Sequence, residues 1–228
     1  MIKMIVFDMA GTVIDENNVV YKTLLKAINA EGYQLTLDQV LEEGAGKEKF
    51  QAIKDITQKQ AGVVNDEIRH NIFQRFQAEL STAYDMINIK AQPGAEDLFR
   101  ELRDKGIYVV LNTGYDTKVA ASILKKVGWK EGKQFDAMIT ASDVVNRRPA
   151  ADMIELAKKR FGLDGSAQIV KVGDSTIDIE EGQNAKCYLS IGITTGAHTR
   201  EQLLGAKPDL IIDNLLEILP LLGKSESR

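Results

Sequence analysis

Short runs of apolar and β-branched residues alternate with amphipathic segments along most of this chain. Nearly every position in these runs is apolar, as is typical of strands buried on both faces of a parallel sheet. The runs lie at 4–7, 107–112, 136–140, 168–174, 188–193 and 209–213. Segments such as 94–106 and 117–129 lie between them and have the spacing of amphipathic helices. The alternation predicts an α/β fold with a doubly wound parallel sheet.

One long stretch interrupts the alternation. Residues 15–90 have the pattern of helices throughout and contain no segment with the pattern of a strand. Pro93 and Gly94 then mark the return of the alternating pattern. We therefore expect an α/β core made of residues 1–14 and 91–228, with an all-helical cap of residues 15–90 inserted after the first strand.

Composition narrows the class of protein. The 228 residues are 44% hydrophobic and 27% charged, which is the balance of a globular protein. The net charge of -4 gives no reason to expect a nucleic acid or membrane partner. The first apolar run is too short for a signal peptide, and the single cysteine, Cys187, excludes an internal disulfide. We expect a cytoplasmic monomer or homodimer.

Polar residues gather where the predicted strands end. Asp8 ends the first strand, Asn112, Thr113 and Gly114 end the second, and Asp174 ends the run "QIVKVGD". Each cluster alone is compatible with a helix cap or a tight turn. Because open α/β sheets bind ligands beyond the carboxyl ends of their strands, the clusters together predict one site.

Taken in order, these motifs resemble the haloacid dehalogenase superfamily of aspartate-nucleophile hydrolases. The resemblance covers essentially the whole chain and implies a Rossmann-like core with an inserted helical cap. In it, Asp8 of "FDMAGT" matches the nucleophile, Thr113 the hydroxyl that holds the phosphate, and Arg148 the basic residue. Asp174 and Asp178 of "VGDSTID" match the acidic motif.

Details of the motifs resemble the phosphonatase-like branch of that superfamily. Ala10 stands where its phosphatases and mutases usually carry a second aspartate, and "NTGY" forms the second motif. This resemblance implies that a small phosphonate, such as phosphonoacetaldehyde or a relative, is cleaved through an aspartyl-phosphate at Asp8. Two alternatives stay open: a phosphatase for small phosphate monoesters, and a non-catalytic protein regulated by phosphorylation of Asp8.

The resemblance also implies a Mg²⁺ site. Asp8, Asp174 and the backbone carbonyl of Ala10 would hold the ion. Asp178 would serve either as a metal-site residue or only as an acid in the first turn of a helix. The residues expected to line the substrate flank these motifs: Met9, Gly11, Thr12, Asn112, Gly114 and Tyr115.

Ala10 bears on the chemistry of the leaving group. Breaking a P–O bond releases an alkoxide that needs a proton, whereas breaking a P–C bond releases a carbanion that needs an electron sink. An imine between a lysine and an aldehyde would be that sink. The Gly44-x-x-Lys47 pattern resembles the phosphonatase loop that carries the lysine, so Lys47 is the candidate. The alternatives for Lys47 are a solvated lysine or one that holds a phosphate.

Overall fold

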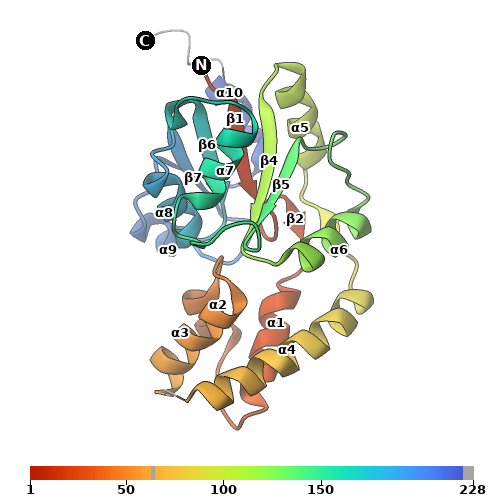
Figure 1. The fold of residues 1–228 in the computed structure, drawn as a ribbon, viewed down its shortest axis with the longest axis vertical. Helices are drawn as coiled ribbons and strands as arrows, with labels where there is room; N and C mark the ends of the chain where they lie inside the picture. Colours follow the sequence, from red (N-terminus) through yellow and green to blue (C-terminus); the bar gives the residue numbers. More distant parts are fainter. Residues whose placement is uncertain (63–64, 223–228) are drawn as a thin grey trace.

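The computed structural model, which describes residues 1–62 and 65–222, is an α/β core with a group of helices below it (Figure 1). The core sheet has six parallel strands in the order β5-β4-β1-β6-β7-β8. They are β1 (Met4–Asp8), β4 (Tyr108–Thr113), β5 (Ala137–Thr140), β6 (Ile169–Gly173), β7 (Leu189–Ile193) and β8 (Leu210–Ile212). Since β1 lies inside the sheet and the chain winds outward on both sides of it, the predicted doubly wound fold is confirmed.

Helices cover both faces of this sheet, which explains why the strands are apolar at nearly every position. All of β1 is buried, and its residues alternate between two cores. Ile5 belongs to the core that includes α5 (Ala95–Asp104), and Val6 to the core that includes α7 (Asp152–Arg160). The remaining helices of the core are α6 (Thr117–Val127), η1 (Ser166–Gln168), α8 (Thr176–Asn184), α9 (Arg200–Gly205), η2 (Leu215–Ile218) and α10 (Leu219–Leu222).

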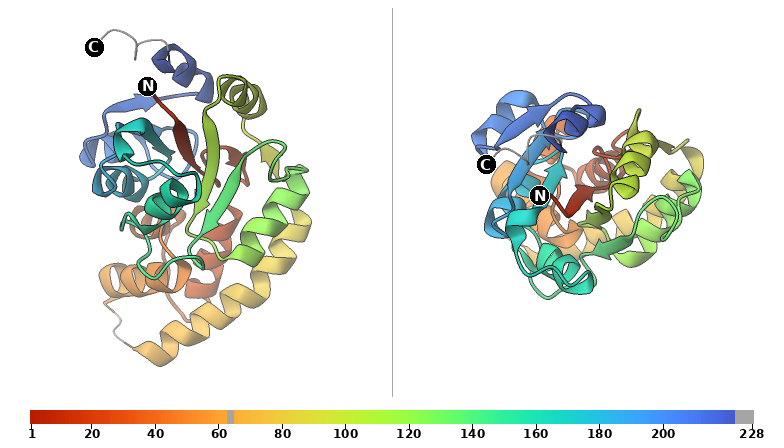
Figure 2. Two further views of the ribbon diagram at one scale, coloured as in Figure 1. Left: turned by 45° about the horizontal axis from the view of Figure 1, so that its top comes forward. Right: turned by 90° about the horizontal axis from the view of Figure 1, so that it is seen from above.

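Helices α1 to α4 form the cap, beyond the end of β1 (Figure 1). They are α1 (Val19–Asn29), α2 (Leu37–Gly44), α3 (Lys49–Ala61) and α4 (Asp66–Met86). Side chains cap several of them: Asn65 accepts hydrogen bonds from the first turn of α4, and Glu48 does the same for α3. Helix α4 runs beside α6 of the core in two views (Figures 1 and 2). The cap therefore faces the end of the sheet where the polar motifs lie.

A small ribbon joins cap and core. Strand β2 (Ile14–Asp15) pairs antiparallel with β3 (Lys90–Ala91), so the two connections between the parts run side by side. The sequence predicted no strand from 15 to 90, because a two-residue strand is too short to show alternation. The division into core and cap at residues 15 and 90 itself stays a prediction.

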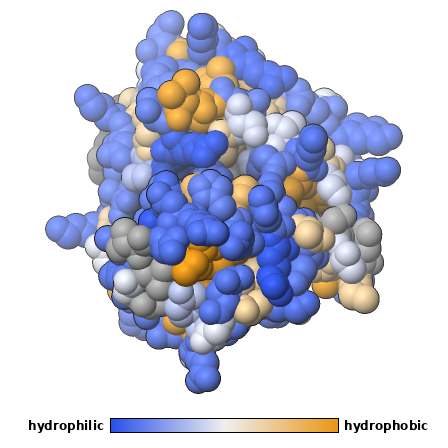
Figure 3. All heavy atoms as spheres, turned by 60° about the horizontal axis from the view of Figure 1, so that its bottom comes forward, coloured by the Kyte–Doolittle hydropathy of each residue, from blue (hydrophilic) through white to orange (hydrophobic). Residues whose placement is uncertain are grey.

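The surface contrasts with the interior. Seen from the cap side, hydrophilic residues cover most of the molecule and apolar residues form small, separate patches (Figure 3). No helix within the described ranges combines the length and the hydropathy needed to cross a bilayer.

Candidate active site

Asp8 ends β1, and the neighbouring strands bring several of the predicted residues to it. Asp8 pairs with Asn112 of β4, while β6 on the other side ends one residue before Asp174. A narrow cavity lies at this edge of the sheet. It is lined by Asp8, Ala10, Tyr21, Gly46, Lys49, Thr113, Gly114, Tyr115 and Asp174. The cavity thus combines carboxylates from the core with a lysine from the cap.

Arg148 holds Asp8 from below. Its Nη1 donates to Asp8 Oδ1 at 2.6 Å and lies 3.0 Å from Asp178 Oδ1. Its Nε lies 3.0 Å from Glu181 Oε2. Burial would lower the pKa of Arg148, but the three carboxylates outweigh burial and hold that pKa above its ordinary value. Arg148 is therefore a permanent cation beside the predicted nucleophile.

A lysine within the sheet completes this arrangement. Lys171 of β6 is fully buried, and its Nζ donates to Asp178 Oδ1 at 2.8 Å and to Asn112 Oδ1 at 3.0 Å. The Asn112 side chain donates to both carboxylate oxygens of Glu181, at 2.9 and 3.0 Å. We call these four residues, together with Arg148, the ionic floor of the site. Asn112, predicted to line the substrate, lies in this floor and not on the cavity.

Asp178 also belongs to the ionic floor, and it is an acid in the first turn of α8. Its Oδ1 faces Arg148 and Lys171, and its Oδ2 accepts a hydrogen bond from Ser175 at 2.5 Å. Burial would raise the pKa of Asp178, but the two cations outweigh burial and hold it below its ordinary value. Both oxygens of Asp178 are therefore engaged away from the cavity, one of them beside Arg148.

Asp174, by contrast, lines the cavity and is positioned by the loops around it. Its Oδ1 accepts from Thr12 Oγ1 at 3.0 Å, and its Oδ2 accepts from the Ala197 backbone at 2.7 Å. Gly11 has a positive φ of 85°, and a Cβ there would lie 2.3 Å from Asp174 Oδ2. Gly11 and Thr12 therefore position Asp174, although both were predicted to line the substrate.

The carboxylates of the cavity resist ionisation in the protein alone. Burial, followed by repulsion from Asp178, raises the pKa of Asp8 to about 8 and that of Asp174 to about 6. A divalent cation would relieve this cost. The described residues hold no group of three or more His, Cys, Asp or Glu arranged for a metal. Two carboxylates and the Ala10 carbonyl still suit Mg²⁺, which commonly takes one or two carboxylates and keeps several waters.

The lysine that reaches this cavity is Lys49 rather than the predicted Lys47. Lys47 Nζ donates to Asp55 Oδ2 at 2.5 Å, along α3. Lys49 is the first residue of α3, and its Nζ donates to the Lys47 carbonyl at 2.7 Å. This ammonium lies 4.8 Å from the ring centroid of Tyr21 and 5.0 Å from that of Tyr115. The turn into α3 therefore sends Lys47 along the cap and Lys49 into the site.

Burial lowers the pKa of Lys49 to about 8, although Glu16 and Asp8 oppose this shift. Glu16 is itself buried, accepting hydrogen bonds from Tyr84 Oη at 2.8 Å and Tyr115 Oη at 3.0 Å. Burial raises the pKa of Glu16 to about 7, against those two hydrogen bonds and Lys49. We call Glu16, Lys49, Tyr21, Tyr84 and Tyr115 the tyrosine cluster. Neither Glu16 nor its partner Tyr84 was predicted.

The remaining predicted residues separate into two groups. Thr113, Gly114 and Tyr115 line the cavity, and the Thr113 hydroxyl accepts from the Tyr115 backbone at 3.2 Å. A Cβ on Gly114 would lie 2.7 Å from the Gly46 carbonyl, so the cap loop passes directly over this residue. Met9 is fully buried in the core cluster and does not line the cavity.

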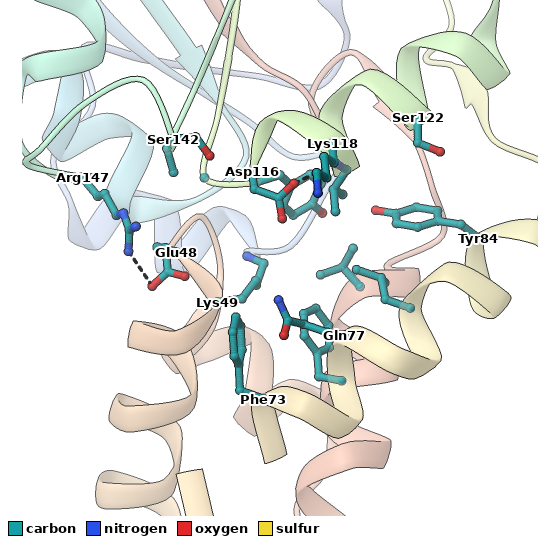
Figure 4. Close-up of a pocket in the computed structure, with 17 residues that line it drawn as sticks. Glu48, Lys49, Phe73, Gln77, Tyr84, Asp116, Lys118, Ser122, Ser142 and Arg147 are labelled. Carbon is teal, nitrogen blue, oxygen red and sulfur yellow. Dashed lines mark hydrogen bonds and ion pairs between the residues drawn. The ribbon is translucent and has the colours of Figure 1, made fainter. Parts of the chain in front are cut away.

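A second cavity, of about 410 Å³, lies between cap and core beside the first (Figure 4). Lys49, Gly114 and Tyr115 line both cavities. At its edge, Arg147 of the core lies 3.0 Å from Glu48 of the cap (Figure 4). The two spaces therefore adjoin at Lys49, Gly114 and Tyr115.

Residues 2–186 match the model of the haloacid dehalogenase-like hydrolase family. The chain belongs to this family. The resemblance noted in the motifs is thus confirmed, and the protein is a hydrolase by family.

The proteins similar to this haloacid dehalogenase-like hydrolase include two curated proteins and one solved structure. It is 28% identical over 223 residues to a phosphonoacetaldehyde hydrolase from Latilactobacillus sakei, covering 93% of this chain and 81% of that protein. It is 31% identical over 132 residues to a phosphoglycolate phosphatase from Pectobacterium atrosepticum, covering 58% of this chain and 55% of that protein. A phosphonoacetaldehyde hydrolase-like protein from Oleispira antarctica has the same fold, with a TM-score of 0.83 and 22% identity over 97% of this chain and 91% of that one.

Proposed function

We propose that this hydrolase cleaves the carbon–phosphorus bond of a small phosphonate such as phosphonoacetaldehyde or a relative, through an aspartyl-phosphate at Asp8. The observation that carries the proposal is the position of Lys49, whose amine lines the same cavity as Asp8. Ala10 leaves its own position in that cavity without an acid, as suits a leaving group that needs no proton to depart. The similarity to a phosphonoacetaldehyde hydrolase over 93% of the chain supports the same chemistry.

Asp8 would attack phosphorus, with Arg148 fixing its other oxygen from below. Thr113 and the backbone near Gly114 line the cavity where the phosphoryl oxygens would lie. Mg²⁺ held by Asp8, Asp174 and the Ala10 carbonyl would supply positive charge against these oxygens. The protein's own cations, Arg148 beneath and Lys49 above, would add to that charge.

Lys49 would provide the electron sink. Its neutral amine, about a tenth of the population at pH 7 for a pKa of about 8, would condense with the substrate carbonyl to form an imine and release water. When Asp8 bonds to phosphorus, the P–C electron pair moves into the imine and leaves an enamine. Protonation and hydrolysis of the enamine release the carbonyl product and free Lys49. Water then hydrolyses the aspartyl-phosphate, so one water is consumed overall for each phosphate released.

Substrate entry would require the cap to move. The cavity at Asp8 has a volume of about 10 Å³, which is about the minimum needed to hold one water molecule. A phosphoryl group is larger than that. The cap loop at Gly46, which passes over Gly114, would have to withdraw and then return to bring Lys49 to the carbonyl.

Hydrolysis of a phosphate monoester is the second candidate, favoured by the similarity to a phosphoglycolate phosphatase. An alkoxide leaving group would then need a proton that Ala10 cannot supply. The Lys49 ammonium, with a pKa of about 8, is an acid in the cavity that lies outside the proposed Mg²⁺ site. Under this candidate, Lys49 would stay cationic and would form no covalent bond.

Borohydride trapping tests which chemistry Lys49 performs. We expect treatment with phosphonoacetaldehyde and borohydride to leave a reduced adduct on Lys49, located by mass spectrometry. Lys49→Arg keeps the charge and cannot form the adduct, so it should lose phosphonate cleavage by at least 10³-fold. Lys47→Arg is the matched control and should keep both the adduct and the activity, because Lys47 is bound to Asp55.

The alternative outcomes are distinct. An adduct on Lys47 would show that the imine forms on the lysine predicted from the sequence and not on Lys49. Absence of any adduct, together with ester hydrolysis that needs Lys49, would make the protein a phosphatase. Absence of phosphate release from both phosphonates and esters, with and without Mg²⁺, would overturn both candidates.

A further inference from the structure

Each of the two cavities would hold a different part of the substrate, because Lys49 lines both of them. Asp8 lines only the small cavity, so the phosphoryl group must lie there. Lys49 lines both cavities and would bond to the carbonyl carbon. Whatever else that carbon carries therefore points toward the space of about 410 Å³ between cap and core. In phosphonoacetaldehyde the carbonyl carries only a hydrogen, which would leave this space to water.

One face of α4 makes an apolar wall of the larger cavity. Phe73, Phe76, Leu80 and Tyr84 lie on it at helical spacing, and the last three are nearly fully buried. Val119 of α6 faces the same space. A volume of about 410 Å³ lies within the roughly 300–1,000 Å³ that small-molecule sites usually have, and such sites are usually lined mainly by apolar groups.

A few polar groups interrupt that wall. Gln77 of α4 extends its amide toward Lys49, and Ser122 of α6 also lines the cavity (Figure 4). Neither side chain has a hydrogen-bond partner in the described part of the protein. Among the nearby charges, Glu48 lies against Arg147, and Asp116 caps α6 through the Val119 backbone, while Lys118 lines the cavity from an exposed position on α6. The space suits an uncharged group with room for one or two hydrogen bonds.

We propose that the substrate is a phosphonate whose carbonyl, two bonds from phosphorus, carries an apolar group of about the size of a phenyl ring, and that this group occupies the larger cavity. The inference rests on the proposed cleavage at Asp8 and names the substrate class within it. The products are phosphate and the methyl ketone that bears the same apolar group.

Binding of non-cleavable phosphonates tests the cavity without any chemistry at Lys49. In calorimetry with Mg²⁺, 4-phenylbutylphosphonate should bind at least tenfold more tightly than ethylphosphonate, because its ring leaves water for the apolar wall. In turnover, 2-oxo-4-phenylbutylphosphonate should exceed 2-oxopropylphosphonate in kcat/KM by at least tenfold. Both compounds are ketones, so the comparison isolates the group that enters the cavity.

A variant that fills the cavity locates the effect. Gln77→Trp should weaken 4-phenylbutylphosphonate at least tenfold and change ethylphosphonate less than threefold. Gln77 is exposed toward the cavity, so the change should not disturb folding. Gln74→Trp, on the same helix, exposed and not lining the cavity, is the matched control and should change neither affinity.

Each outcome decides the proposal. Equal affinity of the wild type for the two phosphonates, or equal losses of both in Gln77→Trp, would overturn the inference and leave cleavage at Asp8 standing. Turnover of 2-oxopropylphosphonate without preference for the larger ketone would do the same. If neither phosphonate binds with Mg²⁺, the proposed function fails and the inference fails with it.

Discussion

The two sides of the cavity at Asp8 use charge in opposite ways. In the ionic floor, Arg148 and Lys171 are matched by Asp8, Asp178 and Glu181 within a few ångströms. In the tyrosine cluster, the single lysine has no carboxylate within ion-pair distance among the described residues, and aromatic rings surround it. Burial there lowers the pKa of Lys49 to about 8, so part of the population is neutral near pH 7. The floor thus holds Arg148 as a permanent cation, whereas Lys49 and Glu16 on the cap side have pKa values close enough to 7 to change protonation.

This difference suits two separate chemical tasks, phosphoryl transfer at the floor and carbonyl chemistry on the cap side. A permanent cation beside Asp8 serves phosphoryl transfer at any physiological pH. A lysine that is partly neutral serves carbonyl chemistry. We expect changes in the floor to affect folding and all activity, and changes in the tyrosine cluster to affect mainly the choice of substrate and the pH dependence.

The largest effect should come from the residue that lies between the two sides. Asp8→Asn should reduce phosphate release by at least 10⁴-fold on every substrate, since an amide is a poor nucleophile at phosphorus. Circular dichroism and thermal melting should show that the fold is kept. Near-normal activity of this variant on any substrate would exclude the aspartyl-phosphate.

Replacing the lysine on each side of the cavity by methionine should change the free energy of unfolding differently for the ionic floor and for the tyrosine cluster. Lys171→Met should lower the free energy of unfolding by about 3–5 kcal/mol, because it leaves Asp178 and Glu181 short of a buried cation. Lys49→Met should leave this free energy unchanged or raise it, since burial already disfavours the Lys49 charge. Urea denaturation at pH 7 measures both. Equal losses would show that the two lysines are held in the same way.

Glu16 should make stability depend on pH. The folded protein keeps the Glu16 proton up to about pH 7, whereas the ordinary pKa of a glutamate is 4.5. Stability from this group is therefore lost as pH rises from about 4.5 to about 7. Glu16→Gln should remove that loss, and its gain over the wild type should grow by on the order of 3 kcal/mol across this range.

Urea denaturation of both proteins at several pH values checks the prediction. Glu42→Gln, which changes an exposed glutamate of the cap, is the control and should parallel the wild type. A constant difference between Glu16→Gln and the wild type at all pH values would mean that Glu16 is already ionised in the folded protein.

The smallest effect concerns Ala10. Ala10→Asp should lower phosphonate cleavage about tenfold, because a new carboxylate repels the anionic substrate, and should keep or raise ester hydrolysis by supplying a proton. Ala10→Asn has the same size without the acid. If both variants reduce both activities equally, position 10 matters only for space.

Sequence patterns predicted the parts of this molecule that depend on local chemistry. Buried strands and the polar residues at their ends can be read from the chain, so the sheet and the convergence of Asp8, Thr113 and Asp174 could be expected. A signal for Lys171 was also present, because a lysine inside the apolar run "QIVKVGD" must find a buried partner. Lys171 was nevertheless not among the predicted site residues.

Other residues depend on how the cap docks, which no local pattern records. Lys47 and Lys49 are two positions apart at the start of one helix, and only the turn into α3 decides which one faces Asp8. Glu16 lies in the polar run "DENN" and has the composition of an ordinary turn. Its burial arises because Tyr84 and Tyr115, distant in sequence, meet it across the boundary.

The ribbon of β2 and β3 limits the directions in which the cap can move relative to the core. The chain crosses between the two parts twice, and hydrogen bonds tie these crossings into one double strap. Two separate linkers would let the cap swivel freely, whereas a paired strap bends easily in one direction and resists twisting. We expect the cap to rotate about a single hinge axis located at this ribbon. Lys49 would then approach every bound carbonyl along the same arc.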